Sequence, residues 1–265
     1  QNKGQVIGLP TGFKQLDEKT SGLQPSDLII VAARPGMGKT AFALNIAQQS
    51  AVKAGASVLI FSLEMSQEQL GQRLIAMQAR VESEKLKKGT LDLKDWDRIN
   101  FALNELNNTK IVIDDTPGIS IMEMRNKCRR LKAEQGLDLI VVDYLQLMTF
   151  DGRADSRQQE ISALSRHLKL LAREMNCPVI VLSQLSRAPE LRQDKRPMLS
   201  DLRESGSIEQ DADIVMFLYR DDYYNENTEK PGVCEINIAK HRSGPTDRID
   251  LTWVARYTKF SDKAL

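Results

Sequence analysis

A short apolar run followed at once by a glycine-rich turn constrains this chain more than any other feature. The run from Leu28 to Ala32 is typical of a buried strand, and the stretch from Lys39 to Lys53 has helical apolar spacing. The turn between them matches the phosphate-loop pattern G-x-x-x-x-G-K-[ST], with Ala33 in place of the first glycine. It reads Ala33-Arg34-Pro35-Gly36-Met37-Gly38-Lys39-Thr40. This order predicts an α/β fold whose loop binds phosphate groups.

The residue types in this loop suit a nucleoside triphosphate. Gly36 and Gly38 let the backbone curl so that its N–H groups and the helix N-terminus form an anion cradle. Lys39 can reach the β- and γ-phosphates, and the Thr40 hydroxyl can bind Mg²⁺. The alternative is a glycine-rich turn with a chance lysine. We predict that residues 33–40 bind ATP, with other nucleoside triphosphates as alternatives, together with Mg²⁺.

Short apolar runs alternate with amphipathic stretches along most of the chain, which predicts a mostly parallel central sheet with helices on both faces. We expect further strands over 58–61, 110–113, 137–142 and 178–182, and helices over 66–79, 91–106, 120–134 and 158–176. Ser66 with Gln69, and Ser120 with Glu123, predict capping boxes at two helix starts. After residue 211 the segments 214–219, 233–239 and 248–254 follow without helices, and we expect them as antiparallel strands at the sheet edge.

Three polar side chains are predicted at strand ends, where open α/β sheets bind ligands. Asp143 ends an apolar strand in the Walker B arrangement and is expected to hold Mg²⁺, partly through water. Glu64 follows the next strand after the phosphate loop and could take a proton from an attacking water. Gln184 could sense or orient the γ-phosphate. The alternatives are a turn aspartate, a surface glutamate that starts a helix, and a turn amide.

Charge and cysteine usage exclude several classes. The 265 residues carry 37 Lys and Arg against 36 Asp and Glu, so a strongly basic nucleic-acid binder or a polybasic membrane protein is not favoured. The three cysteines are far apart, which argues against a zinc site and, without a secretory signal, for reduced thiols and a cytoplasmic location. The apolar runs are too short to span a membrane. The chain begins at Gln1 rather than Met, so we expect an upstream segment.

Several strings in a fixed order carry a family resemblance. They are Gly38-Lys39-Thr40, Ser62-Leu63-Glu64-Met65, Asp143-Tyr144-Leu145-Gln146-Leu147, Ser183-Gln184-Leu185-Ser186-Arg187, and the segment Asp201 to Asp213 with the letters DLRESGSIEQDAD. Together they resemble the C-terminal RecA-like motor domain of bacterial replicative DNA helicases of the DnaB type. The resemblance implies a RecA-like phosphate-loop NTPase domain over residues 12–265, preceded by a linker remnant over residues 1–11.

The resemblance also implies a function and partners. It implies a homo-hexameric ring that couples ATP hydrolysis between subunits to movement on single-stranded DNA and unwinding at the replication fork. Lys240 and Arg242 would reach a neighbour's site, with Arg242 as an arginine finger; alone, they are typical of a solvated turn. Arg203, Glu204 and Gly206 would grip the DNA backbone; alone, they are typical of a polar loop.

Further partners and alternative functions follow from the same resemblance. The loop over residues 149–157 is a second DNA candidate. Primase and a helicase loader are expected through or with an N-terminal domain that is not visible in this sequence, and no membrane partner is expected. The alternatives are a RecA-like recombinase and a regulatory ATPase without helicase activity.

Overall fold

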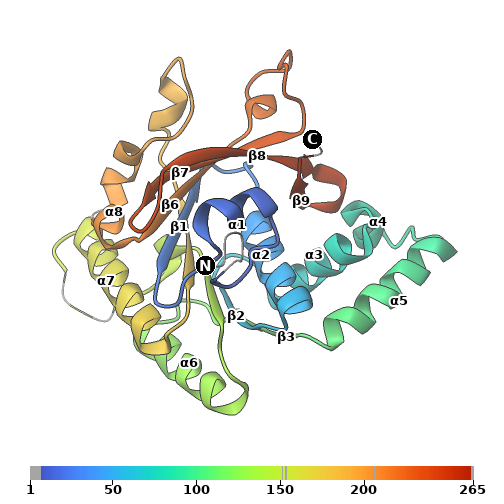
Figure 1. The fold of residues 1–265 in the computed structure, drawn as a ribbon, viewed down its shortest axis with the longest axis horizontal. Helices are drawn as coiled ribbons and strands as arrows, with labels where there is room; N and C mark the ends of the chain where they lie inside the picture. Colours follow the sequence, from blue (N-terminus) through green and yellow to red (C-terminus); the bar gives the residue numbers. More distant parts are fainter. Residues whose placement is uncertain (1–6, 151, 153, 206, 264–265) are drawn as a thin grey trace.

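The structure is a computed structural model that describes residues 7–150, 152, 154–205 and 207–263. Its centre is a nine-stranded sheet with helices on both faces (Figure 1). The strands, in spatial order, are β3 (Lys110–Asp114), β2 (Ser57–Ser62), β4 (Leu139–Asp143), β5 (Val179–Gln184), β1 (Leu28–Ala33), β6 (Ile214–Tyr219), β7 (Val233–His241), β8 (Asp247–Val254) and β9 (Lys259–Asp262).

The α-helices of the described residues are α1 (Lys14–Thr20), α2 (Lys39–Ala54), α3 (Gln67–Ala79), α4 (Ser83–Lys88), α5 (Leu93–Asn107), α6 (Ile121–Gln135), α7 (Arg157–Met175) and α8 (Ile208–Asp211). Six of these eight helices divide between the two faces of this sheet, and α4 and α5 do not. Along β1, Ile29 and Val31 belong to a core shared with α1, α2 and α3, whereas Leu28 and Ile30 belong to a core shared with α6, α7 and α8. Alternate residues of one strand therefore hold two layers of helices, as a sheet covered on both faces requires.

The predicted fold class is confirmed. Strands β3, β2, β4, β5, β1 and β6 pair in parallel, and β7, β8 and β9 add antiparallel strands at the C-terminal edge. Both predicted capping boxes form, at Ser66 before α3 and at Ser120 before α6. Each satisfies backbone N–H groups that a helix start otherwise leaves without partners.

The sheet edge differs from the prediction in one strand. Residues 214–219 were expected to be antiparallel, but β6 pairs in parallel with β1 and antiparallel only with β7. The reason is the connection. After β5 ends at Gln184, the chain returns through α8 to the side of the sheet where the parallel strands begin, so β6 runs in the same direction as β1. Elements α1, α4 and β9 were not predicted because seven, six and four residues are too few to show a period.

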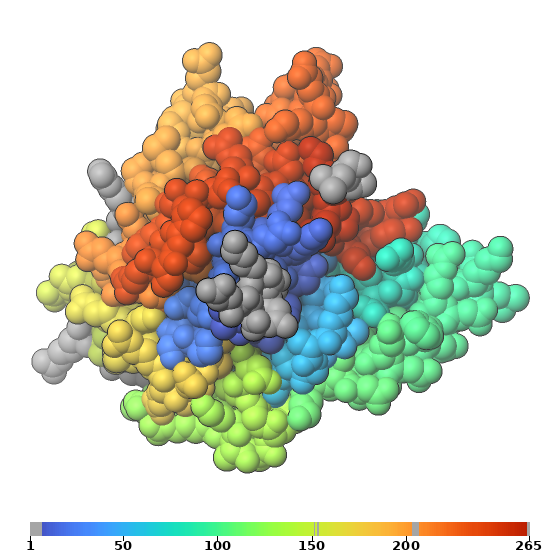
Figure 2. Space-filling model, viewed as in Figure 1, coloured from blue at the N-terminus to red at the C-terminus, as the bar shows by residue number. Residues whose placement is uncertain are grey.

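Two peripheral features complete the fold. Helices α4 and α5 project from the body as one lobe (Figure 2), held by a small apolar cluster of Ala79, Val81, Ile99 and Ala102. Near the start of the chain, Leu9 pairs with Leu23, and the Pro10 carbonyl accepts a hydrogen bond from the Ser50 hydroxyl at 2.8 Å. Residues 1–6 of the predicted linker lie outside the described residues, and the boundary at residue 12 stays a prediction.

Candidate nucleotide site

The turn between β1 and α2 needs glycine at two positions. Gly36 and Gly38 have φ of +82° and +94°, and a Cβ would lie 2.8 Å from Tyr223 or 2.9 Å from Phe260 respectively. Between them the Met37 side chain is buried and anchors the turn in the core. The left-handed backbone is accessible to glycine without a steric penalty, and it makes the tight loop of a phosphate cradle possible.

Thr40 and Asp143 meet beside this turn. The Thr40 hydroxyl donates to Asp143 Oδ2 at 2.7 Å, and the Asp143 side chain is only 2% exposed. Asp143 Oδ1 is buried and has no hydrogen-bond partner in the described part of the chain. Burial raises the pKa of Asp143, while the Thr40 hydrogen bond and Lys39 act in the opposite direction. A hydroxyl and a buried carboxylate with a free oxygen are hard oxygen ligands, so these residues fit Mg²⁺.

Lys39 lies at the same place, at the start of α2. Burial lowers the pKa of its ammonium group, and the Asp143 and Glu64 carboxylates oppose that shift. Its Nζ lies 4.6 Å from the centre of the Tyr144 ring, a cation–π contact. A desolvated ammonium that faces a ring but has no ion-pair partner among the described residues is well placed to bind an incoming anion, because such a ligand supplies the missing counter-charge.

A hollow of about 290 Å³ brings most of the predicted site residues together. Its walls include the phosphate loop, Glu64 from the bend after β2, and Gln184 from the end of β5. Gln146 fixes that end of β5, since its side-chain amide donates to Ser183 Oγ at 2.9 Å and to the Gln184 carbonyl at 3.2 Å. At another wall, Arg34 donates from Nε to Glu190 Oε1 at 3.0 Å and from Nη2 to Glu190 Oε2 at 3.2 Å.

Besides Ala41, which follows the phosphate loop directly, three residues from other elements line this hollow and were missed by sequence reasoning. They are Arg73 from α3, Trp253 from β8 and Thr258 before β9. Arg73 is half-buried, and its guanidinium has no hydrogen bond or ion pair among the residues the structure describes. Burial lowers the pKa of Arg73, whereas Asp143 and Glu64 raise it. The Arg220 guanidinium lies 5.3 Å from the Trp253 ring. No sequence signal marks Arg73 or Trp253, because neither adjoins a recognisable motif.

Lys240 and Arg242 are not brought to this hollow. In the antiparallel pairing of β6 and β7, His241 lies opposite Ile214, the first residue of β6. Both cations therefore lie at the amino edge of the parallel strands, and the phosphate loop lies at the carboxyl edge. The six residues of β1 separate the two edges by roughly 20 Å. Within one chain, neither side chain can reach the phosphate loop.

The candidate DNA loop begins in a segment that contacts α8. The backbone of Arg203 and Glu204 belongs to the 3-10 helix η3 (Leu199–Ser205), while Gly206 falls outside the described residues. The second candidate loop, 149–157, is described except at residues 151 and 153, and it leads directly into α7. Among the described residues, no helix is both long and apolar enough to cross a membrane.

The sheet order and the phosphate loop at its carboxyl edge define the class of this protein, a RecA-like phosphate-loop domain. The chain belongs to the DnaB-like helicase C-terminal domain family, whose model matches residues 8–262. This membership confirms the resemblance drawn from the sequence strings.

Individual relatives agree with the family. The replicative DNA helicase DnaC of Bacillus subtilis (strain 168) is 58% identical over 259 residues, which is 97% of this chain and 57% of the relative. One solved ATPase domain has 43% identity and a TM-score of 0.95, covering 99% of this chain and 94% of that chain. A second solved structure, described as that of a DnaB-like replicative helicase and its interactions with primase, has 43% identity and a TM-score of 0.95. The match covers 98% of this chain and 63% of that chain. This chain therefore spans little more than half the length of the curated relatives it matches.

Proposed function

We propose that this chain is the motor domain of a replicative DNA helicase, which couples ATP hydrolysis to movement on single-stranded DNA and to duplex unwinding. The observation that supports the proposal is the separation of two groups of predicted site residues. The phosphate loop and the cations Lys240 and Arg242 occupy opposite edges of one sheet. A second copy placed edge to edge could bring them together, which suits a ring with shared sites.

The hollow beside the phosphate loop supports ATP as the ligand. The loop N–H groups and Lys39 can bind the phosphate oxygens, and the Trp253 ring, which packs against Phe260, adds apolar surface at another wall. Thr40 and Asp143 would hold Mg²⁺, which when bound neutralises charge on the transferring phosphoryl group. Glu64 would accept the proton of the attacking water, and Gln184 would orient the γ-phosphate.

Arg242 would complete catalysis on the neighbouring chain. Charge spreads over the phosphoryl oxygens in the transition state, and a guanidinium placed there stabilises it more than it stabilises the bound nucleotide. Lys240 would assist as a second cation. The expected assembly is a homo-hexamer.

DNA would be gripped through its backbone by Arg203, Glu204 and Gly206, without reading bases. We also propose primase and a helicase loader as partners, through or with an N-terminal domain. Support for primase comes from one relative, a DnaB-like replicative helicase whose structure was solved for its interactions with primase.

A hydrolysis assay combined with native mass measurement tests this proposal. We expect turnover of ATP that rises on addition of single-stranded DNA and that tracks the hexamer fraction. Turnover without any response to DNA would instead identify a regulatory ATPase. Stimulation by DNA without unwinding of a forked duplex by the oligomer would identify a recombinase-like activity.

A further inference from the structure

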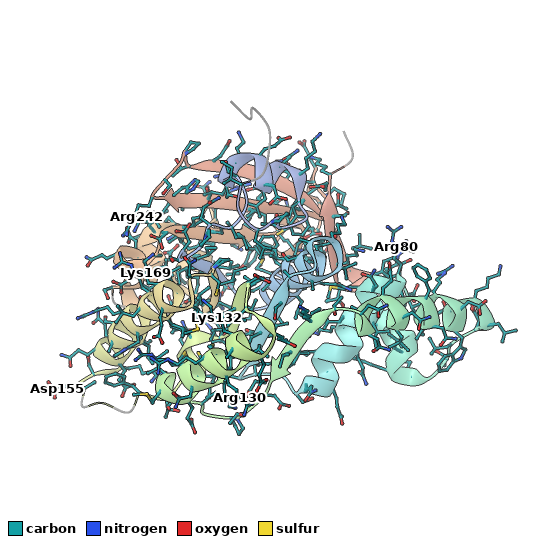
Figure 3. The ribbon with its side chains drawn as sticks, turned by 60° about the horizontal axis from the view of Figure 1, so that its bottom comes forward. Arg80, Arg130, Lys132, Asp155, Lys169 and Arg242 are labelled. Carbon is teal, nitrogen blue, oxygen red and sulfur yellow. The ribbon has the colours of Figure 1, made fainter. Side chains whose placement is uncertain are left out.

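A buried carboxylate, Asp213, lies directly behind Arg242. Asp213 is 6% exposed and lies between the end of α8 and the start of β6. Its Oδ1 lies 3.3 Å from Arg242 Nη1, and its backbone carbonyl accepts the Arg242 N–H at 2.8 Å. Its Oδ2 accepts from the Leu28 N–H at 2.8 Å and from Lys169 Nζ at 2.5 Å. In Figure 3, Arg242 and Lys169 lie at the same end of the molecule. The carboxylate thus connects Arg242 to the first residue of β1.

Arg242 is held on a second side by α8. Its Nη2 donates to the Gln210 carbonyl at 2.9 Å, and Lys240 Nζ donates to the Glu209 carbonyl at 2.5 Å. The Arg242 side chain nevertheless stays 50% exposed. A guanidinium has five N–H donors, so two contacts within the chain leave donors facing outward. The Arg242 guanidinium is therefore oriented by its own chain and retains N–H donors that can bind a further ligand.

We propose that Asp213 is a positioning residue for Arg242, which it orients toward the phosphate groups bound by a neighbouring chain. This inference rests on the proposed function, since it assumes that Arg242 acts between chains. An exposed arginine on a free turn would sample many rotamers, and ordering it at each turnover would raise the barrier. The buried carboxylate removes that freedom before the neighbour binds, because its own position is fixed by Leu28 and Lys169.

The competing role for Asp213 is structural, as the partner of Lys169 and the acceptor for β1. The variant Asp213→Asn separates the two roles because it keeps the shape and one acceptor oxygen but removes the charge. We expect kcat for ATP in the oligomer to fall about 10-fold or more. We expect KM for ATP to change less than about twofold, because the chain's own phosphate loop is untouched.

Mixing experiments give a readout that a structural role would not change. Oligomers mixed from Asp213→Asn and Lys39→Ala chains contain interfaces that pair an intact phosphate loop with an intact Asp213–Arg242 unit. We expect these mixtures to regain turnover that neither variant has alone. The double variant Asp213→Asn with Arg242→Ala should be no slower than Arg242→Ala, within about twofold, since both changes remove one unit.

The outcomes separate this inference from the proposed function. If Arg242→Ala leaves turnover intact, the finger role itself fails. If Arg242→Ala is slow but Asp213→Asn has wild-type kcat, or is slow without rescue on mixing, Asp213 is not a positioning residue. Should Asp213→Asn fail to fold, the double variant Lys169→Met with Asp213→Asn removes both charges of the buried ion pair and takes its place in the same mixing test.

Discussion

Thr40 and Asp143 are 103 residues apart in sequence, yet the Thr40 hydroxyl donates a 2.7 Å hydrogen bond to Asp143 Oδ2. The phosphate-loop helix and the end of β4 are joined at this point. The bond leaves Asp143 Oδ1 buried and without a partner among the described residues. An unsatisfied buried oxygen is unfavourable, so a bound cation or water at this position would relieve that cost.

Removing the Thr40 hydroxyl should therefore change the dependence on Mg²⁺. We expect Thr40→Val to lower ATP turnover about 10- to 100-fold and to require more Mg²⁺ for half-maximal rate. Thr40→Ser is the matched control, since it keeps the hydroxyl, and should stay near the wild-type rate. Turnover measured against Mg²⁺ concentration checks this, and a Val variant with the wild-type Mg²⁺ curve would remove Thr40 from the metal site.

Glu64 is predicted to act in the chemical step and not in binding. Glu64→Gln keeps the size of the side chain but cannot accept a proton, so turnover should fall about 10²- to 10⁴-fold. Binding of a fluorescent ATP analogue should remain within a few-fold of wild type. Glu68→Gln, also exposed and in the first turn of α3, is the control. Equal turnover in the two variants would exclude Glu64 as the base.

The phosphate loop should not tolerate a side chain at Gly38. Gly38→Ala would place a Cβ in a left-handed backbone region, 2.9 Å from Phe260. We expect loss of ATP binding and destabilisation by about 1–3 kcal/mol. Gly71→Ala, inside α3 with no atom within 4 Å of the added Cβ, should instead be neutral or stabilise by up to about 1 kcal/mol. Calorimetry measures ATP binding and urea unfolding measures the stability of the two variants. A Gly38→Ala protein that binds ATP normally would contradict the prediction that this loop binds the phosphate groups.

Asp27, just before β1, should make the stability of the folded chain depend on pH. Burial, with Asp213 as a second cause, raises the pKa of Asp27 from 3.8 to about 6. The folded state therefore holds more protons than the unfolded state between about pH 4 and 6, and this group's contribution to stability is lost as the pH rises through that window. Asp27→Asn should stabilise the chain at pH 7.5 by on the order of 1 kcal/mol, after allowance for solvent screening, and should give no gain at pH 4.

Urea unfolding at both pH values measures that difference directly. ATP binding provides the control, since Asp27 precedes β1 at the edge remote from the phosphate loop. A gain of the same size at both pH values would show that the change acts through something other than the proton.

Arg203 should contribute to the salt dependence of binding to single-stranded DNA. We expect Arg203→Ala to weaken binding and to reduce the slope of log K against log salt by about 0.7, the value for one lost phosphate contact. Arg130→Ala is the control, an exposed arginine on α6 with its side chain 76% exposed (Figure 3). Fluorescence anisotropy at several salt concentrations compares them, and equal slopes in the two variants would place the DNA contacts elsewhere.

Local patterns accounted for much of the fold. Ser66 and Ser120 start their helices as predicted because a capping box depends on residues three apart. The apolar runs that became β1, β2, β4 and β5 were recognisable because strands buried on both faces are apolar throughout. The direction of β6 was not recognisable, since it depends on where the preceding connection leaves the chain.

The candidate site divides in the same way. Sequence patterns were enough to predict that the phosphate loop, Asp143, Glu64 and Gln184 lie close together, because each is at or just after the end of a parallel strand and such strands end on one side of the sheet. The chemical roles of these residues stay predictions. The folded chain was needed to show that Arg73 and Trp253 line the hollow and that Asp213 lies behind Arg242. It was also needed to place Arg242 and the phosphate loop at opposite edges. These contacts join residues far apart in the chain, and their distances depend on packing that no local pattern encodes.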